Sequence, residues 1–119
     1  MRPEEIAVFL SAFRDASEEQ PFGPSVDVYK VAGKMFAIFS PEGPHPSLSL
    51  KCEPSWAAEL RARYTAVVPG YHLNKLHWNT IVLDGTVPDR QLRLMMTHSY
   101  DRVVSGLPKS VRVRLTDEE

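Results

Sequence analysis

The chain of 119 residues contains a single cysteine, Cys52, so no disulfide can form within it. This excludes the small secreted scaffolds that several disulfides hold together. No apolar run approaches the roughly 20 residues that a membrane-spanning helix needs. The first residues are acidic, without the apolar stretch of a signal peptide. We therefore expect a cytoplasmic protein that does not enter a membrane.

Motifs for catalysis and metal binding are absent as well. The six glycines are isolated, so they form no phosphate-binding loop, and no serine lies in a nucleophile elbow. His72 and His77 are five residues apart, which fits neither the helical nor the strand spacing of a zinc pair. Cys52 shares the apolar side of a predicted strand with Leu48 and Leu50, as an inert buried thiol does. We expect no catalytic residue, metal site or cofactor, and hence no enzyme.

The net charge of -1 is small, but it is unevenly distributed. Residues 1–19 contain two basic and five acidic side chains, and the tail 117–119 is entirely acidic. Residues 20–116 therefore hold twelve basic against seven acidic side chains. A basic centre with acidic ends can present a positive face to a partner. The alternative is that these charges are scattered over the surface.

Apolar residues recur with both helical and strand periods along the first half of the chain. A stripe at helical spacing predicts a surface helix over residues 3–16, and consists of Ile6, Phe9, Leu10 and Phe13. Two strands, 27–31 and 34–40, are predicted on either side of the Ala32-Gly33 turn. Residues 34–40 are apolar on both faces, which predicts a central strand. The connector 20–24 is rich in proline, and we expect Phe22 to point inward.

The second half continues the same architecture. Residues 47–52 alternate, with the serines and Lys51 on a face that we expect to be in water. Helices are predicted from residue 54, from 88 and after 108, and strands over 66–68 and 78–83. Short connections between these elements favour an antiparallel sheet with helices packed on one face. We predict one α+β domain over 1–119, a two-layer sandwich.

Several sequence blocks carry a resemblance to a known family. They are Tyr29–Ala37, Leu48–Cys52, Pro69–Lys75, His77–Thr80, His98–Asp101 and Gly106–Lys109. Together the blocks resemble the MmcQ/YjbR family over almost the whole chain, and the run from His72 to Thr80 is the most specific. The resemblance implies a CyaY-like (frataxin-like) sandwich and a DNA-binding role through β-hairpin wings. The chain lacks the acidic ridge of an iron-binding frataxin.

The segment 71–79 concentrates candidate binding side chains and contains no acidic residue. Lys75 can meet a phosphate, Asn74 and Asn79 can bond base edges or phosphates, and Tyr71 can stack on a base. The alternative is that both asparagines satisfy the loop backbone. His72, Asn74 and Lys75 together favour binding, since polar loop clusters often serve it.

A large aromatic residue in a strand is usually buried, so we expect Trp78 to lie in the core. The block His98–Asp101 contains acid–base side chains but lies within a predicted helix, where they face different directions. We expect this block to tie the helix to the loop below it by hydrogen bonds.

Further cations can extend a binding surface if folding brings them together. Lys51 lies on the predicted outer sheet face, and Lys30 and Lys34 lie on the hairpin that is one candidate wing. Such lysines add affinity without reading sequence. Arg102 and the basic segment 109–114 can enlarge the positive surface, or can simply favour helix ends.

We predict a monomer that binds DNA weakly and with little sequence preference. A second hypothesis is a protein-binding adaptor that uses the exposed sheet face or a sheet edge. A third is a small-molecule-binding domain whose pocket includes Tyr71, His72 and His77.

Overall fold

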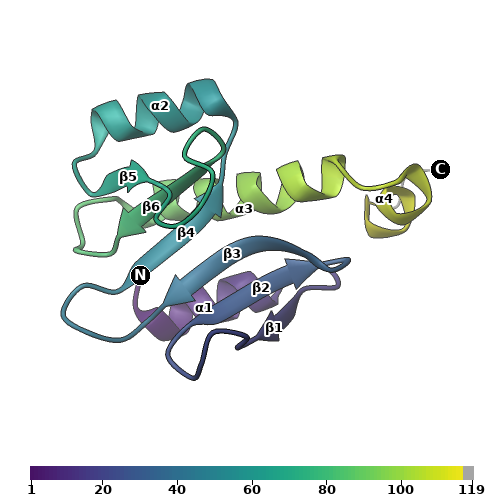
Figure 1. Cartoon of the computed structure of the whole chain (residues 1–119), viewed down its shortest axis with the longest axis horizontal. Coiled ribbons are helices and arrows are strands. Elements are labelled where there is room, and N and C mark those ends of the chain that lie inside the picture. The colour runs from purple at the N-terminus through teal and green to yellow at the C-terminus, as the bar shows by residue number, and fades with distance from the viewer. Residues whose placement is uncertain (117–119) are drawn as a thin grey trace.

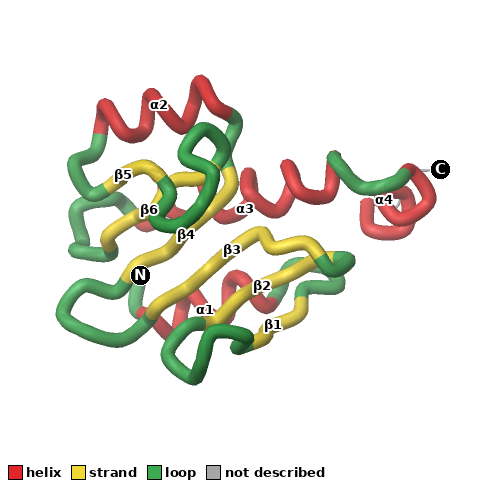
Figure 2. Tube along the Cα trace, viewed as in Figure 1, coloured by secondary structure: helices red, strands yellow, loops and turns green. Residues whose placement is uncertain are grey.

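Six antiparallel strands form one sheet in the order β1-β2-β3-β4-β6-β5 in the computed structural model, which describes residues 1–116. The strands are β1 (Ser17–Glu19), β2 (Asp27–Val31), β3 (Lys34–Ser40), β4 (Ser47–Lys51), β5 (Val67–Pro69) and β6 (Trp78–Val82). The helices are α1 (Pro3–Ser11), α2 (Pro54–Arg63), α3 (Asp89–Ser105) and α4 (Lys109–Thr116). Figures 1 and 2 show α1 and α3 behind the sheet and α2 beside β5 and β6. The predicted α+β architecture is confirmed, whereas the acidic tail 117–119 lies outside the described residues.

The strand register separates two faces of the sheet. Ala37 lies opposite Leu50, and Leu50 lies opposite Asn79, so these side chains share one face. All four helices contribute buried side chains to the core on this face; they include Ile6, Leu60, Met96 and Leu115. We call it the core face, and the opposite side the open face.

The two ends of the sheet are short strands. β1 and β5 have three residues each, and β5 ends at Pro69, which has no N–H to donate. Such edges leave few backbone groups for another strand to pair with. The structure therefore gives little support to an adaptor that works by adding a strand to a sheet edge.

The structure departs from prediction between α1 and β2. The first helix ends at Ser11, five residues before the predicted end, and Asp15 has a φ of 59°, which no right-handed helix accommodates. Strand β1 was not predicted, because all three of its residues are exposed and carry no apolar alternation. The prediction for Phe22 was also wrong: this side chain is 67% exposed.

A β-bulge lies in the middle of the sheet. Tyr29 pairs with Ala37 and Lys30 pairs with Met35, so Phe36 is an extra residue on β3. As a result, both Phe36 and Ala37 are fully buried. The Phe36 ring lies edge-on to Tyr100, with ring centroids 5.3 Å apart. The bulge therefore fits the sheet against α3.

Consecutive residues of α3 tie the helix to three other parts of the chain. His98 Nε2 accepts a hydrogen bond from the Glu53 N–H at 3.0 Å, and Tyr100 donates to the Arg14 carbonyl at 2.7 Å. The Ser99 hydroxyl is fully buried; it donates to the Phe36 carbonyl at 2.6 Å and accepts from the Lys51 N–H at 2.8 Å. This confirms the predicted role of the block His98–Asp101.

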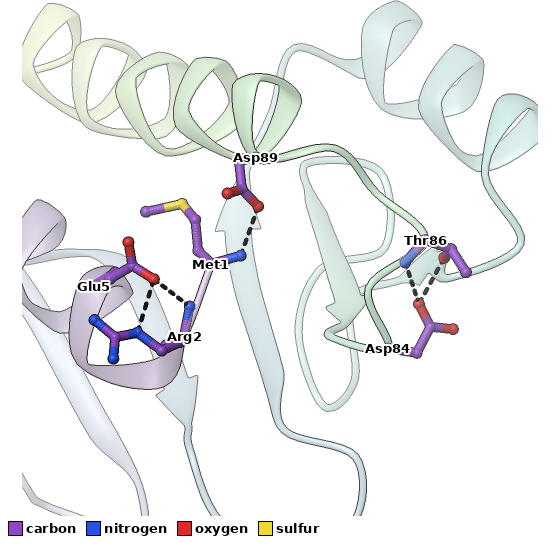
Figure 3. A network of polar contacts seen from close by, with 6 residues as sticks. All are labelled: Met1, Arg2, Glu5, Asp84, Thr86 and Asp89. Atoms are coloured by element: carbon purple, nitrogen blue, oxygen red, sulfur yellow. Dashed lines mark hydrogen bonds and ion pairs between the residues drawn. The ribbon is translucent and has the colours of Figure 1, made fainter.

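The start of the chain is fastened to the start of α3, as Figure 3 shows. The Met1 amine bonds to the Asp89 carboxylate in the first turn of α3, and the Arg2 N–H donates to Glu5 in α1. Close by, Asp84 accepts hydrogen bonds from the N–H and hydroxyl of Thr86 and so shapes the turn before α3. These contacts hold α1 and α3 side by side beneath the sheet.

We predict that Ser99→Ala destabilises the protein by about 1–3 kcal/mol, because a buried carbonyl and a partly buried N–H both lose their partner. Urea denaturation measures this difference. Ser105→Ala is the matched control on the same helix, since the exposed Ser105 hydroxyl donates to the Arg102 carbonyl of its own helix. Equal stability of the two variants would contradict the bridging role of Ser99.

We predict that acid destabilises the fold partly through His98. Burial lowers the pKa of His98 below its usual value, so below a pH of about 6.5 the unfolded chain takes up this proton more readily than the folded one. Stability is therefore lost as the pH falls from 6.5 towards the folded pKa. In thermal denaturation between about pH 7.5 and pH 5.5, His98→Gln should lose less stability than the wild type. Parallel pH profiles would rule this out.

Candidate functional site

A row of side chains crosses four strands on the open face. Ile38 of β3 lies opposite Ser49 of β4, Ser49 opposite Thr80 of β6, and Thr80 opposite Val68 of β5. The two hydroxyl groups in the middle of the row are 2.8 Å apart and hydrogen-bonded. We expected Ser49 to be in water, but this was wrong: Ser49 and Thr80 are each only 7% exposed.

The segment 70–77 folds over one side of this row. The Tyr71 N–H donates to Thr80 Oγ1 at 3.0 Å, and the Gly70 N–H donates to the Trp78 carbonyl at 2.8 Å. A side chain at Gly70 has no room, because its Cβ would lie 2.7 Å from the Cβ of Trp78. The loop is thus held against β6 and continues into Tyr71 and His72 at the edge of the row.

The segment 20–26 lies on the other side. Its backbone is held by Gln20, whose side-chain amide donates to Asp27 at 2.8 Å and to the Pro24 carbonyl at 3.4 Å. Phe22 of this segment and Tyr71 of the opposite loop are 67% and 70% exposed. Between the two loops the open face forms a groove of about 510 Å³. Its lining is Phe22, Val26, Met35, Ile38, Ser40, Ser47, Ser49, Val68, Tyr71, His72, Leu73 and Thr80. We call it the open-face groove.

A second hollow of about 260 Å³ lies where β3 begins and β4 ends, against the last turns of α3. Three cations line it, Lys34, Lys51 and Arg102, and no carboxylate is among its lining residues. Met35 lines both cavities, so this basic hollow adjoins the open-face groove. Folding therefore brings together cations that are far apart in the sequence.

Arg102, which lines this hollow, has an unsatisfied donor. Its Nε is buried, and no partner within residues 1–116 accepts a hydrogen bond from it. Glu53 is near enough for Arg102 to lower its pKa slightly, but the larger causes are hydrogen bonds from Ser55 and Trp56 that cap α2. A buried cationic donor without an acceptor is costly.

Three predicted site residues in the segment 71–79 have structural partners. Asn74 Oδ1 accepts hydrogen bonds from the N–H groups of Leu76 and His77, and Lys75 Nζ donates to the Gly70 carbonyl at 2.9 Å. Asn79 is 2% exposed on the core face, where it is bonded to the Ala57 carbonyl and to Arg61. Asn79 offers nothing to a partner, and Asn74 and Lys75 are partly engaged by their own loop.

The remaining predicted residues are distributed over the two cavities. Lys34 and Lys51 line the basic hollow, whereas Tyr71 and His72 line the open-face groove with their rings 4.0 Å apart. Lys30 is paired with Glu19 at 3.4 Å, which neutralises part of the candidate wing. Trp78 is 9% exposed, as expected for a buried aromatic residue, but it lies on the open face opposite Lys51.

Sequence reasoning missed the hydroxyl pair of Ser49 and Thr80 and the exposed position of Phe22 at the groove. Ser49 was assigned to the outer face, but its partner Thr80 follows from the pairing of β4 with β6, which no local pattern reveals. Phe22 stands in a proline-rich connector, which gives no signal of its exposure. Arg102 was noted only as a possible extension of a positive surface.

Cys52 and the histidines were weighed in the sequence for nucleophilic catalysis and metal binding. Burial raises the pKa of Cys52 to about 11, so this thiol is protonated at neutral pH, in agreement with an inert role. Within residues 1–116 no three His, Cys, Asp or Glu side chains cluster as metal ligands would. His77 does not line the open-face groove, and its buried Nδ1 has no partner among the described residues.

None of the helices described in residues 1–116 combines the length and apolarity that crossing a bilayer requires.

Comparison with known proteins finds one family. A family model described as YjbR matches residues 11–102. The uncharacterised protein YbdF of Escherichia coli O157:H7 is 35% identical over 95 residues, which are 80% of this chain and 78% of YbdF. The uncharacterised protein YjbR of Escherichia coli K12 is 40% identical over 83 residues, 70% of each chain.

Two crystal structures have a similar fold. The Deinococcus radiodurans protein DR2400, with a DUF419 domain, superposes with a TM-score of 0.89 at 33% identity. The alignment covers 96% of this chain and 87% of DR2400. A Pseudomonas syringae protein has a TM-score of 0.74 at 21% identity and covers 86% of this chain and 98% of its own. The second likeness concerns the fold alone. The CyaY-like relationship stays a prediction.

We predict that Gly70→Ala destabilises the protein by about 1–3 kcal/mol, because the added Cβ forces the loop away from β6. Urea denaturation measures the loss. Gly106→Ala is the matched control: Gly106 has a φ of -88°, and the nearest atom to its added Cβ would be the Val103 carbonyl oxygen at 3.6 Å. The control should be neutral or slightly stabilising. A Gly70→Ala protein as stable as the control would contradict the close contact.

Proposed function

We propose that this chain, which belongs to the YjbR family, binds DNA weakly and with little sequence preference. The basic hollow carries the proposal: Lys34, Lys51 and Arg102 converge on one concave surface with no carboxylate among its lining residues. Cations placed in this way neutralise phosphates and do not read bases. The proposed role is that of a binding protein rather than an enzyme.

The Arg102 side chain, which lines the hollow, supports a phosphate as its ligand. A guanidinium presents several N–H donors in a fixed plane that suits phosphate oxygens. Lys51 is held nearby, since its backbone N–H is fixed by the Ser99 hydroxyl at 2.8 Å. Lys34 begins β3 directly after the hairpin turn, so the β2–β3 hairpin acts as the wing that approaches the DNA backbone.

The charge distribution sets how strong this binding is. Lys30 and Lys75 already have partners, Glu19 and the Gly70 carbonyl, which leaves the three cations of the hollow as the principal phosphate contacts. Neutralising three phosphates of duplex DNA gives a slope of log K against log salt of about -2.7. The affinity therefore changes only modestly with salt concentration, and it depends little on the DNA sequence. Tyr71, an exposed aromatic residue on the adjoining groove, is available to stack on an unpaired base.

We predict that Lys34→Gln and Lys51→Gln each weaken DNA binding and reduce the salt slope by about 0.9. Fluorescence anisotropy with labelled duplex and single-stranded DNA at several salt concentrations measures both quantities. Arg90→Gln removes the same charge from the opposite end of α3, roughly 18 Å along the helix from Arg102, and should change the slope little.

Two further variants test the alternative surface in the segment 71–79. Lys75→Ala and His72→Asn should bind DNA nearly as well as the wild type, because Lys75 is engaged by its own loop. Loss of binding in these variants alone would transfer the DNA surface to that loop. No binding by the wild type to any DNA at low salt would overturn the proposed function.

A further inference from the structure

We propose that the open-face groove is a binding site for a small apolar molecule that carries one hydrogen-bond-accepting head group, such as a medium-chain carboxylic acid. This inference does not rest on the phosphate contacts proposed for DNA, because the groove and the basic hollow share only Met35 among their lining residues.

The size and walls of the groove suit an apolar ligand. Its volume of about 510 Å³ lies within the roughly 300–1,000 Å³ of pockets that hold small molecules. Met35 and Ile38 of β3 and Val68 of β5 supply apolar surface from two different strands. A concave site on a rigid sheet needs little reorganisation to bind, which favours affinity.

The two rims carry aromatic side chains that the fold leaves uncovered. Phe22 and Tyr71 are 67% and 70% exposed, and they come from loops on opposite sides of the same cavity. Exposed large apolar residues gathered at a concavity mark binding sites, whereas isolated ones need no explanation. A ligand between the two loops would bury part of both rings.

The floor of the groove offers a hydrogen-bond donor. Ser49 and Thr80 have two hydroxyl hydrogens between them, and their mutual bond of 2.8 Å uses one. The Tyr71 N–H donates to Thr80 Oγ1 at 3.0 Å, so it occupies an acceptor position and leaves the second hydroxyl hydrogen available. An acceptor on the ligand would complete this nearly buried pair.

His72 supplies a second donor at the edge of the groove. An imidazole carries at least one N–H in either charge state, and no hydrogen bond to the His72 side chain occurs within residues 1–116. His72 has a φ of 58°, a conformation that is uncommon for residues other than glycine, and such residues gather at binding sites. The strained backbone sets the imidazole beside Tyr71.

The charge of the lining selects the head group. No Asp or Glu lines the groove, and His72 is the one basic side chain among its lining residues. A carboxylate head group therefore finds hydrogen-bond donors and no negative charge to repel it. An ammonium head group finds no carboxylate to pair with. This complementarity favours an acid over an alcohol, and an alcohol over an amine.

The test uses the fluorescent probe 1-anilinonaphthalene-8-sulfonate, an apolar molecule with an anionic acceptor head. It should bind the wild type at one site, and Phe22→Ser and Tyr71→Ser should each weaken binding about fivefold or more, through lost aromatic contact. Val8→Ser and Leu94→Ser are matched controls, since both residues are exposed apolar side chains outside the groove lining. All four positions are exposed, so the variants should fold; thermal denaturation verifies this.

Competition with decanoate, decanol and decylamine then identifies the head group. We expect decanoate to displace the probe at the lowest concentration and decylamine at the highest. His72→Asn keeps a residue that tolerates positive φ, and should reduce the advantage of decanoate over decanol. Equal probe binding in the groove variants and the controls would overturn the site. Displacement by decylamine at the decanoate concentration would overturn the head group. Lys34→Gln should alter DNA binding alone, so the two proposals fail separately.

Discussion

The hydroxyl of Ser99 holds together the parts of the sheet on which both candidate sites are built. The pairing of β3 with β4 ends at Ala37 and Leu50, next to the bulge at Phe36, and the Phe36 carbonyl and the Lys51 N–H lie just beyond this last pair. Ser99 bonds to both, from a helix packed on the core face. Such a buried polar bridge stabilises the fold mainly because leaving the bonded groups without a partner would cost free energy. It therefore fixes where Lys51 leaves the sheet.

The same constraint links the core face to the open face. With α3 fixed through Ser99 and its neighbours, its last turns bring Arg102 to the end of β4, and the cations of the basic hollow gather there. On the open face the strand register puts Ser49 and Thr80 in contact, and Gly70 allows the loop with Tyr71 and His72 to lie against β6. The shape of both proposed binding surfaces thus depends on how α3 packs on the core face.

Much of the fold was predictable because it follows local rules. The hairpin was predicted at its observed bounds, since Ala32 and Gly33 both adopt the positive φ values, 50° and 77°, that this turn requires. The apolar residues on both faces of β3 correctly indicated a central strand. Strand β1 had no such signal, because it is exposed and pairs with β2 through its backbone alone. The site was less predictable. Tyr71 and His72 were named from the sequence, but it was the structure that separated them from Lys34 and Lys51.

The sequence by itself determined the α+β class, most of the strands and helices, the buried thiol of Cys52 and the anchoring role of the block His98–Asp101. These features depend on periodicity, turn chemistry and residue type, which neighbouring residues express. Only the tertiary structure decided that Asn79 is buried under α2, that Lys75 bonds to its own loop, and that Phe22 and Tyr71 face one groove. The reason is physical: the register between distant strands and the direction of each loop depend on the packing of the whole sheet, and a shift of one residue would reverse every face.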